Sequence, residues 1–340
     1  MNGYPLNSRA QPRRTPRGAP LLAAALVALA LAAPRPALAQ GRPAVVATVG
    51  MIGDVVAELA GGCAEVMVLV GPGTDPHLYR ASAGDVRALA GADLVLYGGL
   101  HLEAGLADVL RSLAGRLPVV AVSEAAVPEA ERIAAGVAGA GAYDPHVWMD
   151  VSLWRRAVPV VAAALADLLA DDPACVERVA AAAEAYAAQL AALHEWAARA
   201  LGTVPADRRV LVTAHDAFGY FGRAYAVEVE GIQGVSTETE AAVADIRRVA
   251  DLIVARGIPT LFLESTINPR TVEAVREAVA ARGGSVALGE SLYADALGDA
   301  GAPEGTYVGM LVHNVTAIVA GLGGEVPPLP AELASWEARW

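Results

Sequence analysis

The 340-residue chain has few of the features on which several classes of protein depend. It holds two cysteines and no Cys-x-x-Cys pair, which argues against dithiol redox chemistry and cysteine-rich zinc sites. Beyond residue 40, no apolar run reaches the roughly twenty residues of a transmembrane helix. A His-Glu-x-x-His motif is also missing, so this signature of a zinc-dependent hydrolase is absent.

Residues 1–39 contain five arginines and no acidic residue. An apolar run at residues 21–33 precedes the small-residue pattern Ala37-Leu38-Ala39. This layout is typical of a secretory signal peptide, and we expect cleavage after Ala39. The apolar run is too short to span a bilayer, and no cysteine near the cleavage point could carry a lipid anchor. We therefore expect an exported protein that is not a lipoprotein.

Removal of the five arginines changes the formal charge from −12 to −17. Such an excess of negative charge argues against nucleic acid and anionic membrane surfaces as partners, and it favours cations. Cys63 and Cys175 both lie in the exported part. An even count in an oxidising compartment favours a disulfide between them, with two buried free thiols as the alternative.

Short β-branched runs alternate with amphipathic segments such as residues 52–60, 83–90 and 103–113. The predicted strands are residues 45–50, 65–71, 93–99, 119–123, 209–215, 226–233, 260–265 and 285–291. Strands that alternate with helices form parallel sheets covered by helices, joined by right-handed crossovers. The sequence therefore predicts an α/β protein of two lobes, each with a four-stranded parallel sheet.

A single long helix is predicted between the lobes. Asp172 suits its N-cap, Pro173 its first position and Gly202 its end, and residues 175–201 are rich in Ala, Leu, Glu and Arg. One rigid helix predicts little relative motion of the lobes. The predicted divisions are a signal peptide (1–39), an N-terminal lobe (40–170), the linking helix (171–203), a C-terminal lobe (204–325) and a tail (326–340).

Asp-Pro-His occurs twice, ending at His77 and at His146, in a chain with only six histidines. Imidazole is the commonest protein ligand of metals such as Zn²⁺, and the preceding proline stiffens the backbone that aims the ring. Two surface turns are the alternative interpretation, because Asp-Pro often opens a turn.

Four polar side chains are expected where predicted strands end. His215 closes one strand, while His77, His146 and Asp295 each follow another. Because ligands of open parallel sheets bind beyond the carboxyl ends of the strands, we expect a site in the cleft between the lobes.

Five ordered segments together resemble one family, the zinc- and manganese-binding solute-binding proteins of metal ABC importers. They are Gly71-Pro72-Gly73-Thr74-Asp75-Pro76-His77-Leu78-Tyr79, Leu96-Tyr97-Gly98-Gly99-Leu100-His101-Leu102-Glu103, Asp144-Pro145-His146-Val147-Trp148-Met149-Asp150, Thr213-Ala214-His215-Asp216-Ala217-Phe218-Gly219-Tyr220-Phe221 and Leu292-Tyr293-Ala294-Asp295-Ala296-Leu297-Gly298. The resemblance implies two α/β lobes joined by one long helix, with the metal between them. It also implies the ligand set His77, His146, His215 and Asp295.

The implied function is a periplasmic, monomeric receptor, with no catalytic activity, that captures Zn²⁺ or Mn²⁺ and delivers it to the permease of an ABC importer. Three imidazoles and one carboxylate suit Zn²⁺ and leave no obligatory position for water. A histidine in the third ligand position, here His215, favours zinc. The chain lacks the long His- and Asp-rich loop of many dedicated zinc receptors, which argues against a receptor specific for zinc alone. A secreted metallohydrolase and an adhesin with a structural metal are the alternative functions.

Several further residues have expected roles around this site. Asp75, Asp144, Asp216 and Glu264 are candidates to hold the second nitrogen of a ligand histidine. Asp216 could instead cap a helix, and Asp150 is expected to cap the helix that follows it. His101 is expected near the site, where it packs or supports a ligand, and a role as a ligand itself is the alternative. His194 is expected at a solvated helix position, and His313 on a helix packed at an interface.

Overall fold

The structure is a computed structural model that describes residues 41–135 and 143–340. The expected signal peptide and its cleavage after Ala39 lie outside the described residues, as does most of the Gly- and Ala-rich loop before His146. Among the described helices, none is both long enough and apolar enough to cross a membrane.

The first sheet has four parallel strands in the order β2-β1-β3-β4. They are β1 (Ala44–Val49), β2 (Glu65–Val70), β3 (Leu94–Tyr97) and β4 (Val119–Ala121). The central strand β1 is buried from its second residue onward, because helices cover both faces of the sheet. We call this sheet with its helices the first lobe.

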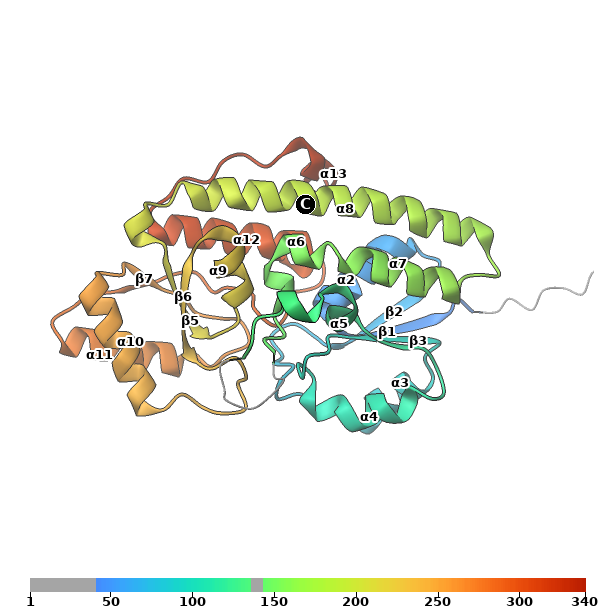
Figure 1. Cartoon of the computed structure of the whole chain (residues 1–340), viewed down its shortest axis with the longest axis horizontal. Helices are drawn as coiled ribbons and strands as arrows, with labels where there is room; N and C mark the ends of the chain where they lie inside the picture. Colours follow the sequence, from blue (N-terminus) through green and yellow to red (C-terminus); the bar gives the residue numbers. More distant parts are fainter. Residues whose placement is uncertain (1–40, 136–142) are drawn as a thin grey trace, which may run out of the picture. The chain divides into compact units, whose positions relative to one another are not determined.

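The helices of the first lobe form two layers. Val45 and Ala47 of β1 pack towards α2, whereas Val46 packs towards α3 and α4 on the other face. Figure 1 shows α3 and α4 below the sheet, with α2 and α7 above it. The elements are α2 (Gly50–Ala60), α3 (Ala83–Ala90), η1 (Ala104–Leu106), α4 (Ala107–Leu113), α5 (Val122–Ala126), η2 (Glu129–Glu131), η3 (Val147–Met149), α6 (Val151–Trp154) and α7 (Ala157–Leu168).

The second sheet repeats this arrangement with the strand order β6-β5-β7-β8. Its strands are β5 (Val210–His215), β6 (Glu228–Gln233), β7 (Thr260–Leu261) and β8 (Ala287–Leu288). Along β5, Val210 and Val212 pack against α10 and α11, while Leu211 faces the large core that includes α9 and α12. The helices of this second lobe are α9 (Gly219–Tyr225), α10 (Val243–Arg256), α11 (Arg270–Ala281), η5 (Pro303–Gly305) and α12 (Tyr307–Leu322).

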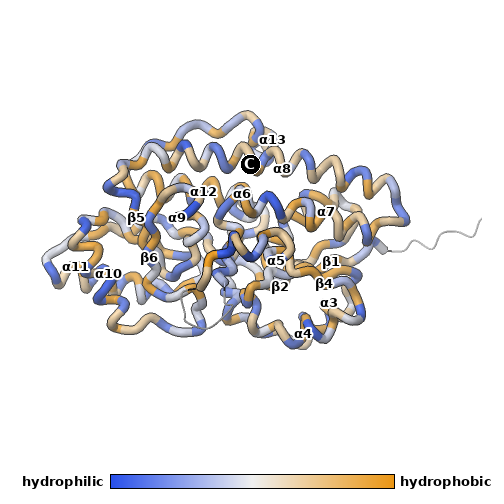
Figure 2. Tube along the Cα trace, viewed as in Figure 1, coloured by the Kyte–Doolittle hydropathy of each residue, from blue (hydrophilic) through white to orange (hydrophobic). Residues whose placement is uncertain are grey.

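The two lobes are joined by α8 (Pro173–Gly202), a helix of 30 residues. The side chain of Asp172 accepts a hydrogen bond from the backbone nitrogen of Cys175, so the predicted N-cap is confirmed. At about 1.5 Å per residue the helix is about 45 Å long. It packs against α2 and α7 of the first lobe and against α9 and α12 of the second. Hydrophilic and hydrophobic residues alternate along it, as Figure 2 shows.

Two further links hold this framework together. A disulfide joins Cys63, just after α2, to Cys175 in the first turn of α8, which confirms the predicted pairing. The chain after α12 runs back along α8, where Trp196 donates a hydrogen bond to the carbonyl oxygen of Pro327. It ends with a short 3-10 helix, η6 (Ala331–Leu333), and a short α-helix, α13 (Ala334–Glu337). A further 3-10 helix, η4 (Ala206–Arg208), lies between α8 and β5. The residue ranges predicted for the two lobes, the linking helix and the tail remain a proposal.

Candidate metal centre

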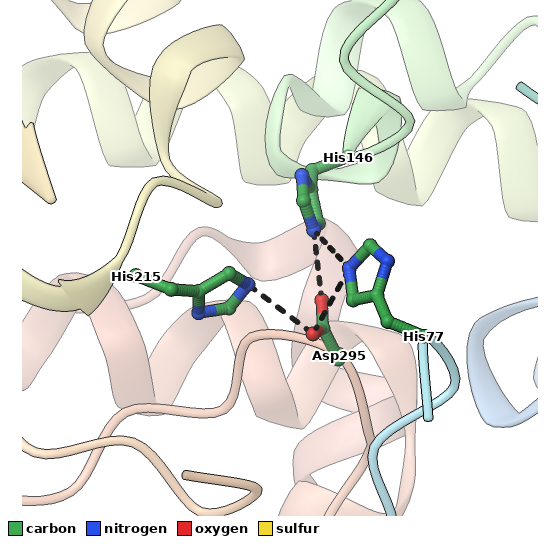
Figure 3. Close-up of side chains that lie close together, drawn as sticks. All are labelled: His77, His146, His215 and Asp295. Atoms are coloured by element: carbon green, nitrogen blue, oxygen red, sulfur yellow. Dashed lines mark hydrogen bonds and ion pairs between the residues drawn. The ribbon is translucent and has the colours of Figure 1, made fainter. Parts of the chain in front are cut away.

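The ends of the strands bring the four predicted side chains together. His77 lies in the turn after β2, His146 immediately precedes η3, His215 is the last residue of β5, and Asp295 lies in the loop after β8. Their donor atoms all lie within 4.8 Å of one another. Figure 3 shows the three rings arranged around the Asp295 carboxylate. We call these four residues the quartet.

The distances within the quartet suit one small ion. The Nε2 atoms of His77 and His146 are 3.3 Å apart, and His146 Nε2 lies 3.1 Å from Asp295 Oδ1. Asp295 Oδ2 lies 3.2 Å from His215 Nε2 and 3.6 Å from His77 Nε2. A tetrahedral zinc shell with bonds of about 2.1 Å has edges of about 3.4 Å. These four distances lie close to the edges of such a shell.

Two carboxylates fix the orientation of two of the rings. Asp144 Oδ1 accepts hydrogen bonds from His146, one from Nδ1 at 2.7 Å and one from the backbone nitrogen at 2.9 Å. Glu264 holds His215 with both oxygens: Oε2 accepts from Nδ1 at 2.5 Å, and Oε1 accepts from the backbone nitrogen at 2.8 Å. In the neutral form of each ring the proton therefore lies on Nδ1, and the lone pair of Nε2 points into the quartet.

The quartet is buried and short of hydrogen-bond donors. His146, His215 and Asp295 are fully buried, and His77 is 4% exposed. Among the described residues, neither oxygen of Asp295 has a hydrogen-bond donor, and His215 Nε2 has no hydrogen-bond partner. Buried acceptors that face one another are costly unless a cation or a proton lies between them. This arrangement fits a metal ion.

Burial and charge shift the pKa values of the quartet in opposite directions. Burial lowers the pKa of His77 to about 4. Burial also disfavours charge on His146, but Asp295 and Asp144 outweigh it and raise its pKa to about 9. The carboxylates of Glu264 and Asp295 likewise outweigh burial and hold the pKa of His215 well above its ordinary value. Burial would raise the pKa of Asp295, yet the charges on His215 and His146 hold it well below its ordinary value.

The other two candidate carboxylates do not hold rings. Asp75 accepts hydrogen bonds from the backbone nitrogen of His77 and from the hydroxyl of Thr237. Asp216 caps no helix, because α9 begins after Phe218 without a side-chain cap, so that expectation was wrong. Asp150 caps α6 as predicted, through the backbone nitrogens of Ser152 and Leu153.

The remaining histidines lie outside the quartet. His101 is exposed and lines the same cavity as His77. His194 is half-buried and hydrogen-bonded to the hydroxyl of Tyr225, so its predicted solvated position was wrong. The contact arises because α9 packs on α8. His313 packs on α12 against Tyr293, as expected, and donates to the carbonyl oxygen of Ser291.

Trp148 has no role among the sequence-based predictions, although an aromatic residue follows each motif histidine by two places, Tyr79 after His77 and Trp148 after His146. The indole nitrogen of Trp148 donates a hydrogen bond to the carbonyl oxygen of Ala294, next to Asp295. Its ring lies edge-on to His146, with 5.2 Å between ring centroids. The signal was the repeated His-x-aromatic pattern, but the contact partner is 146 residues away.

Comparison with known proteins places this chain in a family. The family model described as zinc-uptake complex component A, periplasmic, matches residues 45–321. The zinc-binding protein TroA of Treponema pallidum is 49% identical over 286 residues, which cover 84% of this chain and 91% of TroA. The manganese-binding lipoprotein MntA of Bacillus subtilis is 39% identical, with 82% of this chain and 89% of MntA covered.

Solved structures agree with the sequence comparison. The structure of TroA from Treponema pallidum superposes with a TM-score of 0.79 and covers 83% of this chain and 99% of its own. The structure of Fe(III)-bound YtgA from Chlamydia trachomatis, 30% identical, has a TM-score of 0.75 and covers 84% of this chain and all of its own. The chain belongs to the family of the periplasmic zinc-uptake component A.

Proposed function

We propose that this chain is the substrate-binding protein of a metal ABC importer. It captures Zn²⁺ or Mn²⁺ in the periplasm with His77, His146, His215 and Asp295 and delivers the ion to a membrane permease. The observation that carries this proposal is the quartet itself, in which four buried donor atoms lie within 4.8 Å of one another. The names of TroA and MntA support zinc and manganese as the ions.

The donor set favours holding an ion over using it for catalysis. Four protein ligands complete a tetrahedral shell, whereas a hydrolytic zinc site keeps one position for water. The affinity of an imidazole-rich site rises from Mn²⁺ to Zn²⁺ along the Irving–Williams series. We therefore expect Zn²⁺ to bind more tightly than Mn²⁺, whichever ion the cell imports through this protein.

The ion is cargo rather than a structural element. The lobes are joined by α8, which the Cys63–Cys175 disulfide ties to the first lobe, and a hydrogen bond from Trp148 to Ala294 connects the lobes beside the site. These links are independent of the metal, so the metal-free protein is expected to stay folded. A structural metal, as in the alternative of an adhesin, requires the opposite behaviour.

Titration of the chelator-treated protein tests this proposal. Competition with a chromophoric chelator should give one Zn²⁺ per chain, bound reversibly and more tightly than Mn²⁺. Far-ultraviolet circular dichroism should be the same before and after metal removal, and sedimentation should give a monomer. Absence of zinc binding contradicts the proposal, and unfolding on metal removal favours a structural site. The mass of the exported protein distinguishes cleavage near Ala39 from lipid attachment.

A further inference from the structure

A cavity of about 600 Å³ lies beside the quartet. Residues of both lobes line it, and we call it the vestibule. The first lobe contributes His77 and His101, and the second contributes Asp216, Glu240 and Asp245. Of the quartet, only His77 borders the vestibule, and it is also the only member with measurable exposure, at 4%. The vestibule is therefore a route by which an ion can reach the buried donor atoms.

The charge of the vestibule suits a cation. Three carboxylates line it, and no arginine is among its described lining residues. Arg248 lies 3.7 Å from one of them, Asp245. Because Arg248 also pairs with Glu230, its positive charge is shared between two carboxylates. Cavities lined by one sign of charge concentrate ions of the opposite sign and raise association rates by about 10- to 1,000-fold. The vestibule therefore attracts the divalent ions that the quartet can bind.

The backbone holds His101 in the vestibule at a conformational cost. Gly99, Leu100 and His101 have φ angles of 83°, 54° and 66°. Left-handed conformations of residues other than glycine are unfavourable and persist only where the surroundings impose them. Such strain is common where a side chain must be presented at a fixed place. Here it positions an exposed imidazole at the mouth of the site.

Two carboxylates impose this conformation. Glu103, which is 4% exposed, accepts hydrogen bonds from the backbone nitrogens of Gly98 and Gly99 and from the hydroxyl of Thr48. Glu124 accepts one from the backbone nitrogen of Leu100. These hydrogen bonds fix the turn that carries His101 to the first lobe. The side chain of His101 remains outside the quartet.

We propose that the vestibule is a docking site for the incoming divalent ion and that His101 is its transient ligand. The carboxylates attract the hydrated ion, and His101 replaces part of its water shell before the ion passes to His77. This inference rests on the proposed function and adds a kinetic step to it. A residue that acts only along the route changes the rates of binding and release by the same factor and leaves their ratio, the dissociation constant, unchanged.

Stopped-flow measurement of Zn²⁺ transfer to and from a fluorescent chelator tests the proposal. At low ionic strength, His101→Ala should slow both association and dissociation about tenfold. His313→Ala is the matched control, because His313 is a partly buried histidine of α12 that does not line the vestibule. It should leave both rate constants unchanged. Glu240→Gln should reduce the dependence of the association rate on salt.

The outcomes separate this inference from the function on which it rests. If the parent protein binds Zn²⁺ and His101→Ala leaves both rates unchanged, the inference is wrong and the function stands. If His101→Ala speeds dissociation and weakens equilibrium binding, His101 is a ligand of the bound ion and the docking role is wrong. Failure of the parent protein to bind Zn²⁺ overturns the function and the inference together.

Discussion

The indole nitrogen of Trp148 donates a 2.9 Å hydrogen bond to the carbonyl oxygen of Ala294. Trp148 follows His146 by two residues, and Ala294 precedes Asp295, so one bond joins the segments that carry two members of the quartet. The carbonyl oxygen of Trp148 in turn accepts a hydrogen bond from the hydroxyl of Tyr307 at the start of α12. The two lobes therefore contact each other directly at the site.

Trp148→Phe should weaken zinc binding about tenfold. The substitution removes the donor and leaves the carbonyl oxygen of Ala294 buried without a partner, at a cost of about 1–3 kcal/mol. The loop that carries Asp295 can then shift. Isothermal or competition titration measures the affinity. Trp196→Phe is the matched control, because Trp196 also loses a single hydrogen bond, to Pro327. It should reduce stability without weakening zinc binding.

Asp295→Ala should weaken zinc binding by several orders of magnitude. Asp295 is the only anionic member of the quartet, and at full burial its attraction for the ion is weakly screened. Asp295→Asn should also be severely impaired, because it keeps the shape of the side chain but not its charge. Far-ultraviolet circular dichroism and the metal-free melting temperature should change little. Zinc affinity within threefold of the parent would contradict the role proposed for Asp295.

Glu264→Gln should weaken zinc binding by about 10- to 100-fold, which is typical when a partner of a ligand histidine is lost. An amide oxygen can still accept a hydrogen bond from His215, but it no longer supports the ring with a negative charge. Asp144→Asn should act in the same way through His146. Unchanged zinc affinity in both variants would show that neither carboxylate strengthens the binding of zinc by its histidine. Glu238→Gln, on an exposed residue, is the control.

Zinc affinity should rise with pH between about 6 and 8. In the metal-free protein the pKa of His146 is raised to about 9 and that of His215 is also raised, so both rings hold protons that the metal must displace. Displacement of two protons makes the logarithm of the association constant rise by about two per pH unit. The pKa of His77 is lowered to about 4, so this ring is already neutral between pH 6 and 8. It releases a proton on metal binding, and so steepens the pH dependence, only near pH 4 and below. Competition titrations in a pH series measure the slope, and a flat profile would contradict this assignment.

Loss of the disulfide should lower stability but not metal affinity. Replacing Cys63 and Cys175 by alanine removes a cross-link between residues 112 positions apart and should lower the free energy of unfolding by about 4–5 kcal/mol. Denaturant titration measures the change, and reduction of the parent protein should reproduce it. Since neither cysteine belongs to the quartet, zinc affinity should stay within about twofold. A large loss of affinity would show that the cross-link also positions the site.

The sequence predicted strands β1 and β5 well and strands β7 and β8 poorly. Strands β1 and β5 lie within a residue of their predicted bounds, because continuous β-branched runs in the middle of a sheet leave little choice of structure. By contrast, β7 and β8 have two residues each, where six and seven were predicted. Their pairing continues only as single hydrogen bonds and a bridge between Glu264 and Leu292. The apolar run there reflects burial rather than regular pairing.

By itself, the sequence determined the lobes, the linking helix and which four side chains meet, since strand ends and short motifs are local properties. Only the tertiary structure decided how each histidine is held. Four carboxylates were candidates, and Asp144 and Glu264 bind rings while Asp75 and Asp216 do not. Such contacts form between residues far apart in the chain, or depend on one side-chain rotamer, so they follow from the packing of the lobes. For the same reason the partners of Trp148 and His194 could not be predicted from the sequence.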